Sequence, residues 1–167
     1  SSSFSILNNN IKINGLDSSI KAMNIALNDE NILSDLNISN FQPGKSGHTF
    51  DNTLDQYGNQ YKPEFKQCSI GYRLDKLVED FSLPIPNHIK IDVDGNEKKV
   101  LAGFGDILKH PNLKSIMIEV HLESELKDKA TDIIISSGFT KLEGNEYINK
   151  EYLKTGFQNL FFVKNNW

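Results

Sequence analysis

Cysteine is nearly absent from this sequence. Cys68 is the single cysteine, so neither an internal disulfide nor a metal cluster of several cysteines can form within the chain. Chains without disulfides are typical of reducing compartments, and the cytoplasm is therefore the expected location. The flanking residues KQCSIGY favour a strand, so we expect the Cys68 thiol to be buried and structural rather than nucleophilic.

The sequence also lacks long apolar runs and an excess of positive charge. No run approaches the roughly 20 apolar residues of a membrane-spanning helix, and the start SSSFSILNNN has no basic segment followed by an apolar core. Lys and Arg number 18 against 22 Asp and Glu, which gives no electrostatic attraction to nucleic acid. We therefore expect no membrane span and no nucleic-acid partner, and a small molecule such as a carbohydrate as substrate.

The order of predicted elements indicates an α/β fold in a single domain, residues 1–167. Apolar spacing predicts a short helix from Phe4 to Ile13 that ends at Asn14-Gly15. Strands are then expected over residues 20–27, 32–38 and 67–72, and a helix over 73–81. A long Gly/Pro/Asn-rich loop joins the second and third of these strands.

The clearest unit is a strand, a helix and a strand between residues 88 and 121. HIKIDVD (88–94) is typical of a strand, NEKKVLAGFGDILKH (96–110) of a helix, and LKSIMIEVH (113–121) of a second strand, with a turn at Gly95. A crossover of this length predicts parallel neighbouring strands. A helix from Glu123 to Ser137, ended by Gly138, and an antiparallel hairpin of FTKLEGN (139–145) and FQNLFFVK (157–164) follow.

Polar residues gather where the two strands of this unit end. Asp92, Asp94 and Glu97 follow the first strand, and Glu119 and His121 end the second; ligands of open parallel sheets bind at such ends. We expect Asp92 or His121 near the reacting group, with His121 or a carboxylate accepting a substrate hydroxyl proton. A charge inside an apolar strand needs a partner to offset its desolvation, which favours a functional Asp92.

Plainer roles are open for the same residues. Asp94 would cap the following helix, Glu97 would merely favour its positive end, and His121 would be a satisfied loop histidine. A metal site would take oxygen and nitrogen ligands from Asp92, Asp94, Glu119 and His121. No spacing in the sequence requires a metal, and we assign none.

The long loop adds two candidate substrate-binding residues. Ser46 and His48 flank Gly47 in the segment SGHT (46–49). Long loops without their own secondary structure are commonly functional lids. We expect this segment to fold over the crevice, so that Ser46 and His48 join Asp94 in binding the substrate.

The string IKIDVDGNEKKVLAG (89–103), followed across a helix by IMIEVH (116–121), resembles the FkbM-type methyltransferase family. The hallmark of that family is a strand ending in Lys-Ile-Asp-Val-Glu-Gly-x-Glu and a later Ile-Glu-x-His; Asp94 stands where the family often has Glu. RLDKL (73–77) matches the family's Leu-Asp element. The resemblance extends upstream to NIALND (24–29) and to Phe4, Leu7, Asn10, Asn14 and Gly15.

This resemblance implies a doubly wound, mostly parallel Rossmann-like sheet with an antiparallel last strand. It implies methyl transfer from S-adenosylmethionine to oxygen, commonly a hydroxyl of a sugar or a natural-product scaffold. Asp92 would lie by the methionine portion of the cofactor, and the adenine would be bordered by the turn of Ala26, Leu27, Asn28 and Asp29. The family does not settle the catalytic base, so Glu97, Glu119 and His121 all stay as candidates.

The resemblance also implies a glycine-rich cofactor loop that should precede Ser1. The family's first two strands, with this loop and an acidic residue, have no counterpart in these residues, and Gly103-Phe104-Gly105 is no substitute because it falls within or beside a helix. In this fold those strands sit between the strand at Ile20 and the strand at His88. We therefore expect an N-terminally incomplete fold whose central sheet order is interrupted, or whose gap is covered by a second copy in a homodimer.

Two other functions are open on the residues alone. A non-catalytic fold remnant, or a binding or assembly module, would keep the fold without the cofactor loop. A nucleotide-sugar enzyme would need a phosphate-cradling loop, which this stretch lacks.

Overall fold

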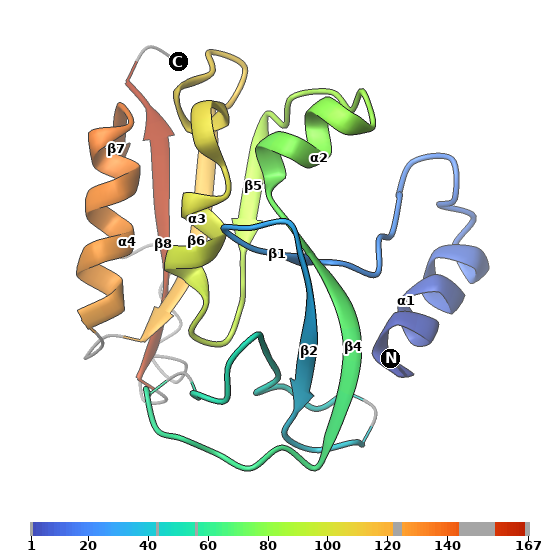
Figure 1. Cartoon of the computed structure of the whole chain (residues 1–167). Coiled ribbons are helices and arrows are strands. Elements are labelled where there is room, and N and C mark those ends of the chain that lie inside the picture. Colours follow the sequence, from blue (N-terminus) through green and yellow to red (C-terminus); the bar gives the residue numbers. More distant parts are fainter. Residues whose placement is uncertain (1, 43, 56, 122–124, 144–155, 166–167) are drawn as a thin grey trace.

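The α/β class expected from the sequence is confirmed, with its strands divided between two sheets (Figure 1). A computed structural model describes residues 2–42, 44–55, 57–121, 125–143 and 156–165. Within these residues each sheet has four strands. The expected interruption of the central sheet order is seen here, because β1 and β5 belong to different sheets.

The first sheet has the strand order β1-β4-β2-β3. Its strands are β1 (Ala26–Leu27), β2 (Ile32–Ile38), β3 (Thr49–Phe50) and β4 (Phe65–Tyr72). β1 pairs with β4 in parallel, while β2 pairs antiparallel with both β3 and β4. The prediction for residues 32–38 is confirmed, and β4 begins at Phe65 rather than at Gln67.

The strand predicted over residues 20–27 is wrong for most of its length. Only Ala26 and Leu27 pair with β4, and Ile20 and Met23 are 41% and 43% exposed. The backbone amides of Ser19 and Ile20 both donate to the carbonyl oxygen of Leu16, so the chain forms turns where the predicted strand would begin. Apolar content alone suggested a buried strand, but a strand also needs a neighbour that takes its backbone hydrogen bonds.

Cys68 is exposed, which corrects the prediction of a buried thiol. It lies opposite Asp35 in the pairing of β4 with β2. Successive side chains of a strand point to opposite faces, so Cys68 shares its face with Ile70, which is 49% exposed. The segment is a strand as predicted, but its register places the thiol on the open face.

The second sheet has the strand order β5-β6-β8-β7. Its strands are β5 (His88–Ile91), β6 (Ser115–His121), β7 (Phe139–Lys141) and β8 (Phe157–Lys164). β5 and β6 are parallel neighbours and β7 and β8 are antiparallel, both as predicted. β6 also pairs antiparallel with β8. The described residues thus form two mixed sheets, and the single, mostly parallel doubly wound sheet is not seen among them.

The helices are α1 (Ser2–Ile13), α2 (Leu74–Asp80), α3 (Glu97–Ala102) and α4 (Glu125–Ser136), with a short 3-10 helix, η1 (Gly105–Lys109). α1 ends before Gly15 and α4 before Gly138, both in the left-handed region with φ of 64° and 90°. The helix predicted over residues 96–110 is instead divided into α3 and η1. Gly105 has φ of 52° at this break, a conformation that interrupts an α-helix. Residues 123, 124, 144 and 145 of the predicted helix and hairpin lie outside the described residues.

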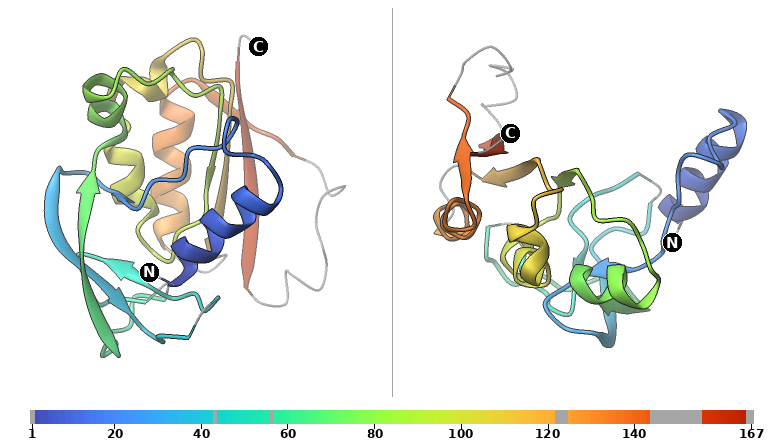
Figure 2. Two further views of the ribbon diagram at one scale, coloured as in Figure 1. Left: turned by 90° about the vertical axis from the view of Figure 1, so that its right-hand side faces the viewer. Right: turned by 90° about the horizontal axis from the view of Figure 1, so that it is seen from above.

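The core lies on one face of the second sheet, under α3, η1 and α4. Figure 2 shows α3 and α4 on the same side of this sheet. Alternation along β6 buries Ile116, Ile118 and Val120 on the core face, while the residues between them are only half-buried. Fully buried members of the core are Leu101, Phe104, Leu113, Ile116, Ile118, Ala130, Ile134 and Phe162.

Adjacent phenylalanines of β8 offer a test of this arrangement. Phe162 is fully buried, whereas Phe161 is 39% exposed. Phe162→Ala is expected to lower the free energy of unfolding by about 3–5 kcal/mol, because it removes apolar contacts and leaves a cavity. Phe161→Ala is the matched control and should lower it much less in the same urea titration. Equal losses would contradict the assignment of the core face.

Candidate functional site

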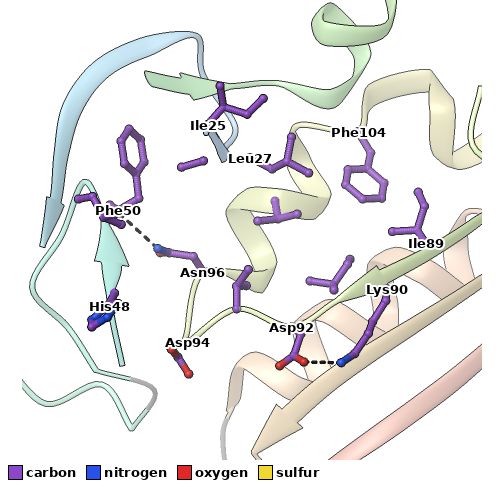
Figure 3. A pocket seen from close by; sticks show the side chains of 15 residues that line it. Ile25, Leu27, His48, Phe50, Ile89, Lys90, Asp92, Asp94, Asn96 and Phe104 are labelled. Atoms are coloured by element: carbon purple, nitrogen blue, oxygen red, sulfur yellow. Dashed lines mark hydrogen bonds and ion pairs between the residues drawn. The ribbon is translucent and has the colours of Figure 1, made fainter. Parts of the chain in front are cut away.

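A cavity of about 440 Å³ lies between the end of β1 and the turn that follows β5. Figure 3 shows its wall, with apolar side chains such as Ile25, Leu27, Phe50 and Phe104 toward one end and Asp92, Asp94 and His48 toward the other. The cavity therefore has an apolar part and an acidic part. It brings together five of the residues predicted from the sequence, namely Ala26, Leu27, His48, Asp92 and Asp94.

Asp92 lies just beyond β5 rather than inside it, because β5 ends at Ile91. Its side chain is 45% exposed and forms an ion pair with Lys90. The hydrogen bond to Asp92 raises the pKa of Lys90 above its usual value. The sequence argument that a buried Asp92 needs a partner is therefore corrected: the partner exists, but the carboxylate is half in water.

Asp94 holds the long loop against the turn of residues 92–96 between β5 and α3, here called the motif turn. The amide of Gly47 donates a hydrogen bond of 2.7 Å to Asp94 Oδ2, so the SGHT segment contacts the turn after β5. Asp94 does not cap α3, because its carboxylate is occupied by the loop and α3 has no side-chain capping bond. Ser46 is not part of the cavity wall; its carbonyl oxygen accepts a bond of 3.2 Å from Ser39 Oγ.

His48 stands on the cavity wall with one ring nitrogen already engaged. The backbone amide of Ser39 donates to His48 Nδ1 at 3.3 Å. An amide can only donate, so this contact places the unprotonated nitrogen of the imidazole at Nδ1. The Nε2 nitrogen is then the one that carries the proton.

Three further contacts join the loop to α3, and the sequence had not singled out the residues that make them. Asn52 Nδ2 donates to Asn96 Oδ1 at 2.9 Å, and Asn96 Nδ2 donates to the carbonyl oxygen of Phe50 at 3.3 Å. Lys99 forms an ion pair of 3.0 Å with Asp51. Asn96 adjoins the motif turn and could have been flagged there, but Asn52 carries no signal in the sequence.

Glu97 is a buried carboxyl at the start of α3. It is 7% exposed, and the amide of Gly95 donates to its Oε1 at 3.1 Å. Burial raises the pKa of Glu97, and two backbone hydrogen bonds to the carboxylate only partly oppose that rise. Glu97 does not line the cavity.

Glu119 and His121 end β6 as predicted, but neither lines the cavity. The His121 ring lies edge-on to Tyr57 and Phe157, with ring centroids 4.9 Å and 5.1 Å away. A side chain on Gly156 would begin 2.4 Å from His121 Nε2. Among the described residues, no group of three or more His, Cys, Asp or Glu side chains is arranged to hold a metal ion.

The turn after β1 holds the other predicted cofactor-binding residues. Asn28 is buried, and its backbone amide donates to the carbonyl oxygen of Tyr72 at 3.0 Å. The carbonyl oxygen of Asp29 accepts a bond of 2.9 Å from Arg73 Nη1. Asn28 and Asp29 lie beside the cavity rather than on its wall, whereas Ala26 and Leu27 line it.

Comparison with known proteins agrees with the family resemblance that the residues of the motif turn suggested. A match to the methyltransferase FkbM domain covers residues 5–140. The chain belongs to this family. The FkbM domain described here is also similar to the hexuronic acid methyltransferase AglP of Haloferax volcanii, with 35% identity over 75 residues, or 43% of this chain and 30% of the relative.

The chain thus spans less than a third of the length of that curated relative. No solved structure matches this chain significantly. Within the described residues, no helix has the length and apolarity needed to cross a membrane.

Burial of Glu97 predicts a pH dependence of stability. A raised pKa in the folded state means that the protonated form is favoured there, so the stabilisation is full below the ordinary value of 4.5 and is lost as pH rises through the raised value. Glu97→Gln, which cannot ionise, should abolish this loss in urea titrations across the pH range. Glu30→Gln, at an exposed carboxyl, should keep it; an unchanged profile for Glu97→Gln would contradict the burial.

The bond between Asp94 and Gly47 gives a second test. Asp94→Ala removes the acceptor that the Gly47 amide uses, so hydrogen exchange at Gly47 should accelerate by about tenfold or more. Asp94→Asn keeps an acceptor oxygen and should lie between the two. Wild-type exchange at Gly47 in Asp94→Ala would show that the loop is held by other contacts.

Proposed function

We propose that this FkbM domain transfers a methyl group from S-adenosylmethionine to an oxygen of a carbohydrate-like small molecule, within a Rossmann-like methyltransferase fold. The observation that carries the proposal is the cavity shared by the turn after β1 and the turn after β5. Support for the reaction comes from membership of the family. Support for a sugar-like acceptor comes from the relative that is named as a hexuronic acid methyltransferase.

The chemistry of the cavity wall suits such a cofactor. S-adenosylmethionine has an electrophilic methyl group on a positively charged sulfur, an amino acid end with an ammonium and a carboxylate group, and an aromatic adenine whose faces are apolar. Asp92 and Asp94 place negative charge at one part of the wall, and Lys90 offsets only part of it. Leu27 and Ile25 offer apolar contact at the other part. We therefore assign the adenine to the turn of Ala26–Asp29 and the methionine portion to Asp92.

We assign binding of the methyl-accepting substrate to Asp94 and His48. Ser46 shapes the loop that carries His48. His48 Nε2 bears a proton in the tautomer that Ser39 selects, so His48 donates a hydrogen bond to an acceptor oxygen rather than taking a proton there. Glu97, Glu119 and His121 are the remaining proposals for the proton acceptor. Burial raises the pKa of Glu97, but a general base must also reach the substrate hydroxyl, and none of the three lines the cavity.

Methyl transfer from radiolabelled S-adenosylmethionine to hexuronic acids and neutral sugars tests the proposal. Asp92→Asn should lower transfer by about 100-fold, the scale of a positioned electrostatic group. Asp35→Asn is the matched control, because Asp35 forms a comparable surface ion pair with Lys66 and does not line the cavity; it should leave transfer unchanged. Equal rates for the two variants would remove Asp92 from the site.

Titration of S-adenosylhomocysteine in a calorimeter tests the cofactor separately from the acceptor. Binding in the micromolar range that is weakened by Asp92→Asn is the expected result. A wild-type chain that neither binds the cofactor product nor transfers methyl to any acceptor would refute the proposed reaction for this chain.

A further inference from the structure

The segment Gly103-Phe104-Gly105 lies at the junction of three elements. It joins α3 to η1, and it faces both the start of α2 and the turn after β1. Phe104 between the two glycines is fully buried and lines the cavity. The spacing of the motif assigns no role to these glycines, and the proposed reaction does not use them.

Gly103 is in direct contact with the turn after β1. A Cβ atom at residue 103 would lie 1.9 Å from the carbonyl oxygen of Asn28 and 2.9 Å from its carbonyl carbon. Real Cβ atoms do not approach that closely, and the obstacle is backbone, which cannot rotate away. The φ of Gly103 is -73°, so glycine is needed here for space and not for backbone conformation.

Gly105 acts on the same turn through two side chains. A Cβ atom at residue 105 would lie 2.2 Å from Asp75 Oδ2. Asp75 in turn accepts a bond of 2.9 Å from Arg73 Nε, and Arg73 Nη1 donates to the carbonyl oxygen of Asp29 at 2.9 Å. Both glycines therefore reach consecutive carbonyl groups of one turn, Gly103 directly and Gly105 through the Asp75–Arg73 pair.

A hydrogen bond joins the two branches. The amide of Asp75 donates to the carbonyl oxygen of Gly103 at 3.2 Å, so α2 is docked on the same residue that contacts Asn28. The planar guanidinium of Arg73 fixes the direction of its bonds, which an ammonium group would not do. Displacement of either glycine contact would move the Asn28–Asp29 backbone and with it Ala26 and Leu27 on the cavity wall.

We propose that Gly103 and Gly105 are positioning residues that fix the Ala26–Asp29 turn on the wall of the cavity. Asp75, the aspartate of the Leu-Asp element before the motif strand, is the link between Gly105 and Arg73. The identity of the ligand that this turn holds rests on the proposed function. The placement of the turn does not.

Hydrogen exchange tests the placement without any ligand. Gly103→Ala should accelerate exchange of the Asn28 amide, which bonds to the carbonyl oxygen of Tyr72, by about tenfold or more. Arg73→Lys, which adds no bulk, should accelerate exchange in the same turn to a smaller degree and serves if Gly103→Ala does not fold. Wild-type exchange at Asn28 in both variants would overturn the proposal.

A double-mutant cycle tests the Gly105 branch. Gly105→Ala should accelerate exchange in the turn, and Asp75→Ala should remove part of that added effect because the clashing carboxylate is gone. Gly58→Ala is the matched control, since Gly58 has φ of 81° but no atom within 4 Å of the position that a Cβ would take. Gly58→Ala thus introduces the backbone strain without the clash. Strictly additive effects of Gly105→Ala and Asp75→Ala on the exchange rate would count against the Gly105 branch.

Cofactor affinity separates a positioning role from a purely structural one. Gly103→Ala should weaken S-adenosylhomocysteine binding by about tenfold or more, and should raise KM for S-adenosylmethionine more than it lowers kcat. Unchanged affinity in Gly103→Ala would overturn the role at the cavity. A wild-type chain that neither binds S-adenosylhomocysteine nor transfers methyl, together with faster exchange at Asn28 in Gly103→Ala, would refute the proposed function and leave the placement standing.

Discussion

Burial of one face of the second sheet is the constraint on which the site depends. α3 is held there by Val100 and Leu101, both buried against β6 and its neighbours. With the helix fixed, the chain has only the residues between Ile91 and Glu97 in which to turn, and Gly95, with φ of 93°, makes that turn possible. Hydrophobic packing beneath the cavity, to whose wall Ile91 and Val100 also belong, thus decides where the carboxylates of the motif stand.

Three carboxyl groups occur within this short turn, and the fold gives each a different environment. Asp92 is paired with Lys90 at the cavity, Asp94 accepts the amide of Gly47, and Glu97 is buried with the amide of Gly95. Like charges held so close would oppose one another unless each had its own partner or lost its charge. The burial that raises the pKa of Glu97 is one such solution.

Much of the fold could be predicted from local pattern. The alternation in SIMIEVH, the apolar stripe of LDKLVED and the glycines at positions 15 and 138 each specified an element that the structure contains. Local pattern failed where pairing or register decided the outcome. Residues 20–25 are apolar but mostly unpaired, and Cys68 lies on the outer face because β4 pairs with β2 in one register and not the next. The break between α3 and η1 was missed because Gly105 was taken as part of a helix.

The sequence by itself determined the chemistry of the motif turn, since the residue types and their spacing after β5 require no distant information. It also carried the resemblance to the family, whose match covers residues 5–140. Only the tertiary structure decided which of the candidate residues meet. Ala26, His48 and Asp92 come from three separate segments and line one cavity, whereas Glu119 and His121 do not. The physical reason is that contacts between segments depend on sheet order, register and close backbone approach such as that of Gly103 to Asn28, and none of these is written in local spacing.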